Sequence, residues 1–452
     1  MQLAKTNHVT VNVIDAIMGS GKTTWMIEKI NNDLKPRYIV VTPTLDEVAR
    51  LINDCPKARF KAPDDKGVHG KKYADFEQLI KDGENIVTTH SLLSRMTTKI
   101  LDALKKQQYT LMVDESLAVV SVYKELTSKD MTMLFNGKYV YVEPDSFKLR
   151  WNHKDHPDYK GKFWEIREKC DNGNLIHFQK NTMLWEFPIE FLRVFKDVWV
   201  LTYLFQSSPM ANYLLADGTK VNLYSLKGQS SKFVPPTLID YKDHDETAVK
   251  DILRSPGVIN LYDGPLNDIG KPSLKAPKIL SKNWYTTKAK PKDIEAVKNA
   301  IYNYFRHVID AKSVDLIWTV FGSKKTKKNK RYGRGIVEKL EGKGYARGFI
   351  PNNTKATNDY IDRKHIAYMQ NTFHHPKIFD YFKARGVIVI EDLYSLSEMI
   401  QLIWRSRIRK WESIDVFIPS SRMRHLFKCW LNTNSSSCLL YTSDAADDLL
   451  CV

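Results

Sequence analysis

The sequence of 452 residues has few cysteines and no long apolar stretch. Its five cysteines, at positions 55, 170, 429, 438 and 451, form neither a paired framework nor a Cys-x-x-Cys metal motif, which favours a reducing compartment. No run of about 18 apolar residues occurs, and the N-terminus lacks the apolar core of a signal peptide. We therefore expect a soluble, cytoplasmic protein without a membrane partner.

Acidic residues are also in short supply. There are 52 Asp and Glu against 69 Lys and Arg, which leaves a formal net charge of +17. A basic surplus favours a polyanion as partner, although a solvated basic surface gives the same count. The length allows two or three domains, each with a core of its own.

The last part of the chain, residues 438–452, differs from the rest in charge and pattern, since it holds Asp but no Lys or Arg. Back-translation of residues 438–448 gives DNA that resembles a transposase adapter used in sequencing libraries. We therefore interpret this tail as foreign to the protein and expect native sequence only up to about residue 437.

Residues 9–27 are the most informative stretch, because a β-branched run stops at a glycine-rich turn and continues in a helical pattern. Gly19 and Gly21 let backbone N–H groups surround an anion, and the positive end of the following helix points at the same place. Lys22 is expected on the phosphates and the Thr23 hydroxyl on Mg²⁺. The predicted ATP-binding residues are Ala16, Gly19, Ser20, Gly21, Lys22, Thr23 and Thr24.

The form Ala-x-x-Gly-Ser-Gly-Lys-Thr, with Ala16 where Gly is usual, resembles motif I of superfamily 2 helicases. A second apolar run then ends in Asp114, Glu115 and Ser116, which resembles motif II of the DEAD-like family. Such a pair serves phosphoryl transfer, since Asp114 would help to hold Mg²⁺ and Glu115 would polarise the attacking water. An acidic pair at a strand end also occurs for structural reasons, but its place after a phosphate loop favours the catalytic interpretation.

Three segments resemble the nucleic-acid-binding motifs of the same family. Residues 42–44 follow a buried strand as motif Ia does, although Thr44 would serve equally well as a helix cap. Residues 89–91 resemble motif Ib or Ic, and residues 348–363 resemble motif V. The resemblance implies backbone contacts for Thr42, Pro43, Thr44, Thr89, His90, Ser91, Thr357 and Asn358.

Residues 397–409 are predicted to form a helix with Gln401 and Arg405 on one face. They resemble motif VI, Gln-x-x-Gly-Arg-x-x-Arg, with Trp404 in place of Gly and the last Arg one residue late. The resemblance implies catalytic roles for Gln401 and Arg405 and an arginine finger at Arg407 or Arg409. In a regular helix Arg405 and Arg409 share a face while Arg407 points away from it. A basic surface helix is the plainer alternative.

The expected fold is α/β, with two RecA-like P-loop domains, parallel sheets and an insertion in the first domain; the resemblance supplies the two domains. We place the first domain at 1–215, a linker at 216–240 and the second domain, with the arginine helix, at 241–437. The insertion, at about 119–194, mixes aromatic with basic residues, which suits single-stranded nucleic acid. Alternatively it is a small β-rich unit that packs Trp151 and Trp164 in its own core.

Residues 9–437 are similar to helicase-like proteins of tailed bacteriophages. This resemblance implies an ATP-dependent nucleic-acid translocase or helicase, with ATP and Mg²⁺ as cofactors, that acts on DNA in phage replication or recombination. RNA is an alternative nucleic-acid partner, and other replication proteins are candidate protein partners.

Two rival functions remain. A phage DNA-packaging ATPase would usually add a nuclease domain with clustered carboxylates, and none is evident after residue 240. A nucleic-acid-binding protein with a degenerate ATPase is favoured by Trp404 and by Thr202-Tyr203-Leu204 where motif III has Ser/Thr-Ala-Thr. The intact phosphate loop and acidic pair speak against that second rival.

Overall fold

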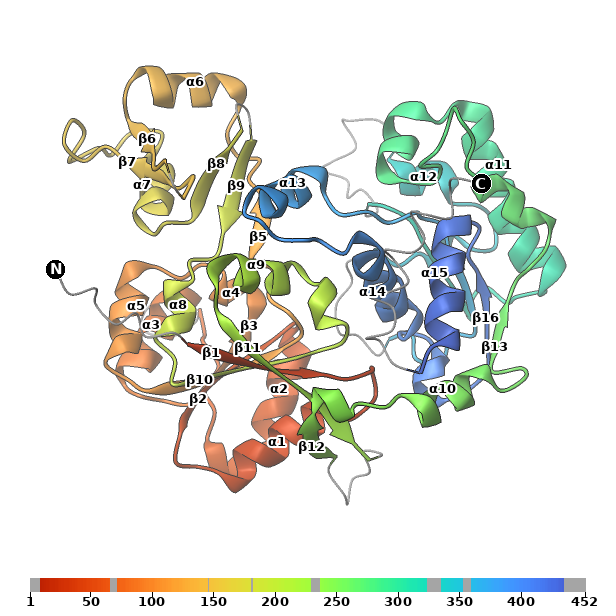
Figure 1. Cartoon of the computed structure of the whole chain (residues 1–452), viewed down its shortest axis with the longest axis horizontal. Helices are drawn as coiled ribbons and strands as arrows, with labels where there is room; N and C mark the ends of the chain where they lie inside the picture. Colours follow the sequence, from red (N-terminus) through yellow and green to blue (C-terminus); the bar gives the residue numbers. More distant parts are fainter. Residues whose placement is uncertain are drawn as a thin grey trace. The chain divides into compact units, whose positions relative to one another are not determined.

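The computed structural model describes residues 9–65, 71–144, 146–179, 182–228, 236–322, 335–352 and 359–434 (Figure 1). The chain divides into two compact units. The first comprises Met1–Ala16, Ser20–Asp243 and His375–Val389, and the second comprises Ile17–Gly19, His244–His374 and Ile390–Val452. Each unit is built on a mainly or wholly parallel sheet, so the predicted α/β fold class is confirmed. In the described part of the chain no helix is long and apolar enough to cross a membrane.

The sheet of the first unit has seven strands in the order β12-β11-β1-β10-β4-β2-β3. Only the β11 to β12 pair is antiparallel. The central strands are apolar on both faces, as expected for a parallel sheet covered on two sides. The strands are β1 (Thr10–Asp15), β2 (Arg37–Thr42), β3 (Ile86–Thr89), β4 (Tyr109–Asp114), β10 (Asp197–Thr202), β11 (Lys220–Lys227) and β12 (Thr237–Asp240).

Helices cover both faces of this sheet. On one face, α1 (Lys22–Asn32) and α2 (Leu45–Asp54) share a core with one set of alternate strand residues. On the other face, α3 (Lys72–Lys81), α5 (Thr98–Lys105) and α9 (Pro209–Asp217) pack against the opposite set. The shorter helices α4 (His90–Leu93) and α8 (Glu190–Arg193) also belong to this unit.

The segment 216–240, interpreted above as a linker, instead adds β11 and β12 to the first sheet. Gly218 ends α9 in the left-handed conformation, with φ 74°, and therefore marks a helix terminus rather than flexible chain. The residues of β11 are mostly half-buried and polar residues alternate with apolar ones. The segment therefore lacks the continuous apolar run that marks the central strands. The first unit accordingly extends to Asp243.

The region of the expected insertion forms two small antiparallel sheets, β5-β9-β8 and β6-β7, with a core of its own. Trp151 is buried in that core, as the β-rich alternative expects, but Trp164 is 49% exposed. The elements are β5 (Val120–Val122), α6 (Ser128–Asn136), β6 (Val140–Val142), β7 (Leu149–Trp151), α7 (Trp164–Asp171), β8 (Leu175–Phe178) and β9 (Thr182–Glu186).

The second unit has a four-stranded parallel sheet in the order β13-β16-β15-β14. Its core joins this sheet to α11 and to several buried aromatic side chains. The strands are β13 (Ile259–Leu261), β14 (Leu316–Thr319), β15 (His365–Tyr368) and β16 (Ile414–Phe417), and the helices are α10 (Thr247–Arg254), α11 (Pro291–Asn303), α12 (Ile336–Leu340), α14 (Glu391–Ile403) and α15 (Ser421–Asn432).

One segment crosses the expected domain boundary. Residues 375–389, here called the strap, lie in the range expected for the second domain but belong to the first unit. The strap contains α13 (Pro376–Ala384), which packs against β5 and α9. Tyr381, Phe382 and Val387 join the apolar core of the first unit. Chain order gives no signal of this assignment, because it depends on packing between residues far apart in sequence.

Candidate nucleotide-binding site

The turn between β1 and α1 has the backbone shape that the sequence predicts. Gly19 and Gly21 adopt left-handed φ angles of 83° and 89°, which favour glycine. Helix α1 begins at Lys22 without a side-chain cap and without an acidic residue in its first turn. Gly21 at the N-cap position has no side chain that could accept from the first backbone N–H groups, and an anion is favoured at such a helix N-terminus.

Two side chains in the turn bear on whether a phosphate fits there. The Ser20 hydroxyl is buried and has no hydrogen-bond partner among the described residues, so it is a donor suited to a ligand oxygen. Lys22 folds back and donates from Nζ to the Ala16 carbonyl, which closes the turn. The residues of the loop therefore fit a bound phosphate group.

Asp15, the last residue of β1, was not singled out from the sequence. Its carboxylate is 2% exposed and accepts hydrogen bonds from the backbone N–H groups of Leu204 and Phe205, at 2.8 and 2.9 Å. Leu204 itself has a positive φ of 55°, so this contact holds the tight turn that follows β10. A charged residue at the end of an apolar strand was the available signal, because a buried charge needs partners.

The acidic pair lies at the end of β4, two strands away from β1 in the sheet. The pKa of Asp114 is raised to about 7, chiefly by burial and also by the negative charge of Glu115, while the positive charge of Lys22 opposes the rise. Glu115 has a φ of 66°, which is unusual for a residue with a Cβ, and its N–H donates to the Leu201 carbonyl at 2.9 Å. Strained backbone of this kind clusters at functional sites.

Hydrogen bonds join the ends of these neighbouring strands. The Ser116 hydroxyl donates to the Thr202 hydroxyl at 3.1 Å, and the Ala16 N–H donates to the Thr202 carbonyl at the same distance. Thr202 therefore connects the acidic segment with the start of the phosphate loop. Residues 202–204 depart from the Ser/Thr-Ala-Thr pattern, but the Thr202 hydroxyl at its first position still forms a hydrogen bond.

The segments that resemble motifs Ia and Ib differ in exposure. Thr42 is fully buried, its hydroxyl donates to the Thr44 carbonyl at 3.1 Å, and Thr44 caps α2 by accepting from the Glu47 N–H at 3.4 Å. Thr44 therefore does act as the helix cap that the sequence allowed, and Pro43 between the two is half-buried. These contacts give Thr42 and Thr44 a structural role in the turn after β2.

The turn after β3 lies beside the acidic pair. The imidazole Nε2 of His90 lies 2.8 Å from the Asp114 carbonyl oxygen. Thr89 is half-buried and Ser91 is exposed at the start of α4. Thr357 and Asn358 lie outside the described residues.

The helix expected over residues 397–409 ends early, which is a correction. Helix α14 stops at Ile403, and a separate 3-10 helix covers Arg407–Lys410. Ser406 causes the break, because its hydroxyl donates to the Ile403 carbonyl at 2.6 Å and accepts from the Ile408 N–H at 3.5 Å. The argument that Arg405 and Arg409 share one helical face is therefore wrong.

The four candidate catalytic residues of this region have different surroundings. Gln401 is half-buried on α14 and donates to the Ser397 hydroxyl at 3.1 Å. The Arg407 guanidinium donates from Nη2 to the Ser413 hydroxyl at 2.8 Å and from Nε to the Ser413 carbonyl at 2.5 Å, so it is tied into its own loop. Arg405 is half-buried and Arg409 is exposed.

The fold and this site define an α/β protein with a glycine turn that fits a phosphate and with an acidic strand end. The chain belongs to the family of YonV. It is 35% identical over 429 residues to the SPbeta prophage-derived uncharacterized protein YonV of Bacillus subtilis (strain 168), across 93% of this chain and 98% of that one. Sequence models of the YonV middle domain and of the YonV C-terminal Rossmann-like domain match residues 120–185 and 254–431.

Solved structures show weaker similarity. An XPD helicase is 11% identical with a TM-score of 0.47, covering 95% of this chain and 96% of that one. The DUF1998 helicase MrfA, bound to DNA and AMPPNP, is 12% identical with a TM-score of 0.33, covering 95% and 49%. Xpd4 of S. tokodaii is 9% identical with a TM-score of 0.46, covering 94% of each chain. Values this low do not establish a common origin or function.

Proposed function

We propose that the chain is an ATP-dependent nucleic-acid translocase or helicase that acts on DNA. The observation that carries this proposal is the set of hydrogen bonds that connects neighbouring strand ends at one edge of the first sheet. There an uncapped helix start and the free Ser20 hydroxyl lie at the end of β1, and the acidic pair lies at the end of β4. Thr202 of the intervening strand β10 bonds to both segments, which supports the proposal that they act as one site.

The chain's own groups divide the work as follows. Backbone N–H groups of residues 19–24 and the Ser20 hydroxyl bind the phosphates, and Lys22 leaves the Ala16 carbonyl to contact them. Glu115 accepts a proton from the attacking water. The backbone hydrogen bond from Glu115 to Leu201 of β10 holds this residue in place. Mg²⁺, held by Thr23 and Asp114, would neutralise phosphate charge; one carboxylate plus a hydroxyl and phosphate oxygens is a usual shell for this ion.

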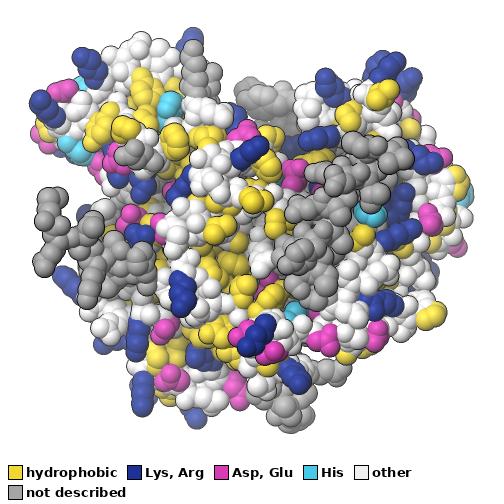
Figure 2. Space-filling view, viewed as in Figure 1, with side chains coloured by type: hydrophobic (Ala, Val, Ile, Leu, Met, Phe, Trp, Pro, Cys, Tyr) yellow, Lys and Arg dark blue, Asp and Glu magenta, His cyan; other side chains and the backbone are white. Residues whose placement is uncertain are grey.

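The nucleic-acid partner rests on separate support. The net charge of +17 attracts a polyanion, and Ser91 is an exposed hydroxyl next in sequence to His90, whose ring contacts the Asp114 carbonyl. On the face that Figure 2 shows, the described Lys and Arg side chains are spread among acidic ones, so the charge there is not gathered in one patch. The prophage source of the relative favours a role in phage DNA replication or recombination, together with other replication proteins.

The rival of a degenerate ATPase keeps one specific observation in its favour. Arg407 is engaged by Ser413, and the helix that should present the arginines ends before them. A protein of this kind would bind ATP and nucleic acid without turnover, which the experiment below detects.

The test measures ATP turnover in parallel with no nucleic acid, single-stranded DNA, duplex DNA and RNA. We expect DNA to stimulate turnover. Lys22→Ala should lose ATP binding, because the ammonium group proposed to contact the phosphates is removed. Glu115→Gln should bind ATP while turnover falls by about two orders of magnitude or more.

Lys35→Ala, at an exposed position after α1, is the matched control for Lys22 and should behave as the parent. Turnover that no nucleic acid stimulates would refute the translocase proposal. Normal hydrolysis by Glu115→Gln would refute the role given to the acidic pair.

A further inference from the structure

The insertion, which in the structure spans residues 119–187 rather than 119–194, joins the rest of the first unit through two adjacent strands. Val120 at its start pairs with Glu186 at its end, and the Phe187 N–H donates to the Val119 carbonyl at 2.8 Å. We call these residues, 119–120 and 186–187, the neck. The orientation of the whole insertion depends on what holds the neck, since these strands are its covalent connections to the sheet.

The Glu186 carboxylate is the centre of the contacts at the neck. It is 5% exposed, and its Oε2 accepts the Tyr381 hydroxyl at 2.6 Å and the Arg385 Nη1 at 3.3 Å. Arg385 also donates to the Tyr381 hydroxyl at 3.1 Å and to the Ala216 carbonyl of α9 at 3.3 Å. Glu186 is therefore bound to two residues of the strap, and one of these reaches on to α9.

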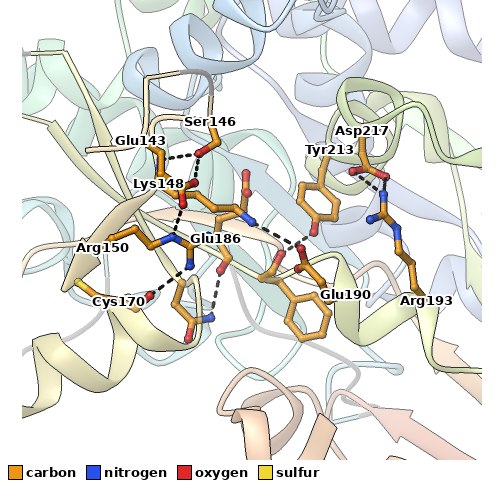
Figure 3. A network of polar contacts seen from close by, with 12 residues as sticks. Glu143, Ser146, Lys148, Arg150, Cys170, Glu186, Glu190, Arg193, Tyr213 and Asp217 are labelled. Carbon is orange, nitrogen blue, oxygen red and sulfur yellow. Dashed lines mark hydrogen bonds and ion pairs between the residues drawn. The ribbon is translucent and has the colours of Figure 1, made fainter. Parts of the chain in front are cut away.

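Neighbouring contacts support the same junction (Figure 3). The Tyr213 hydroxyl of α9 donates to the Phe187 carbonyl, and Lys148 of the insertion lies 3.7 Å from Glu190 of α8. The ring of Tyr381 packs edge-on against Phe178 of β8, with 5.5 Å between centroids. The strap thus contacts the insertion through both polar and apolar groups.

Separating the polar groups of this junction is energetically unfavourable, because they are buried. Burial raises the pKa of Glu186, while the Tyr381 hydroxyl and the charge of Arg385 act against that rise. Removing one donor leaves a buried carboxyl group with fewer partners, which destabilises the junction. A buried hydrogen-bonded network of this sort favours one arrangement of its parts over others.

We propose that Glu186, Tyr381 and Arg385 are positioning residues that fix the insertion on the first unit, and that nucleic-acid stimulation of ATP turnover needs this fixed orientation. The inference rests on the proposed function. The strap is connected along the chain to a candidate catalytic residue, because it ends at Val389 and the chain continues at once into α14, which carries Gln401. The same short segment therefore bears on the insertion and on a candidate catalytic residue.

The test compares Tyr381→Phe and Arg385→Gln with Arg193→Gln in the full chain. Arg193 pairs with Asp217 at 3.0 Å between α8 and α9 and contacts none of the three positioning residues, so it is the matched control. Amide hydrogen exchange is followed in the neck and the strap, and ATP turnover is measured with and without DNA. Exchange reports local opening independently of any activity.

In both strap variants we expect neck and strap amides to exchange about tenfold faster or more, because a partner of a buried carboxyl group is lost. DNA stimulation should fall several-fold while turnover without DNA stays near the parent value. Arg193→Gln should change neither. Unchanged exchange, or equally faster exchange throughout the chain, would overturn the inference.

Faster local exchange with full DNA stimulation would likewise overturn it, since the contacts would then be structural only. If the parent itself shows no stimulation by any nucleic acid, the proposed function and the link to turnover both fail. The exchange data still decide whether the three residues hold the insertion, so the two failures are distinguishable.

Discussion

Replacement of Asp114 by Asn should stabilise the protein at the same time as it weakens metal-dependent ATP binding. Burial and the charge of Glu115 raise the pKa of Asp114 to about 7, whereas the same group in an unfolded chain has a pKa of about 3.9. The folded protein therefore binds this proton more tightly than the unfolded chain. Stability falls as the pH rises from about 4 to 7, because the folded state must then bury a charge.

The size of the effect follows from the shift. A difference of about three pKa units corresponds to about 4 kcal/mol at 1.36 kcal/mol per unit, and relaxation around the charge lowers that upper value. Asp114→Asn removes the charge, so we expect a gain of about 2–4 kcal/mol at pH 8 and almost none near pH 4. ATP affinity in the presence of Mg²⁺ should fall, since an amide is a poorer ligand than a carboxylate.

The assay is urea unfolding of parent and variant at both pH values, followed by ATP titration with and without Mg²⁺. Asp102→Asn, at a side chain that is 68% exposed in a pair with Lys105, is the matched control and should change stability by less than about 1 kcal/mol at either pH. A variant that gains as much stability at pH 4 as at pH 8 would refute the reasoning, because the gain would then not come from removing a buried charge. Glu115→Gln should also move the apparent titration of Asp114 to lower pH, since its charge contributes to the shift.

Two further substitutions test the contacts around the site. Asp15→Asn should cost about 1–3 kcal/mol in urea unfolding and lower ATP turnover, because one of the two backbone N–H groups at Leu204 and Phe205 loses its acceptor. Equal stability of parent and variant would contradict this. Arg405→Ala should lower ATP turnover by about a hundredfold with little change in ATP affinity, whereas Arg407→Ala should mainly lower stability, since Arg407 is bonded to Ser413. Turnover kinetics and thermal unfolding of both variants are the measurements, and a severe turnover defect in Arg407→Ala alone would contradict this expectation and assign the finger to Arg407.

The phosphate loop and the acidic strand end could be predicted from sequence because their geometry is local. The β-branched run before Gly19 and Gly21 and the helical pattern after Lys22 specify a strand, a turn and a helix within about 20 residues. The apolar run before Asp114 likewise specifies a strand with polar groups at its end. Parallel pairing then places such ends at one edge of a sheet.

The sequence by itself determined the α/β class, the positive φ angles at the two loop glycines and the order of the chemical groups along the chain. Tertiary structure alone decided which strand ends meet through Asp15 and Thr202, where α14 stops, and to which unit the strap belongs. The physical reason is the distance in sequence between the residues that interact. A turn or a strand is stabilised by residues a few positions apart, whereas the partner of a buried carboxylate such as Asp15 or Glu186 lies almost 200 residues away and is selected only when the core packs.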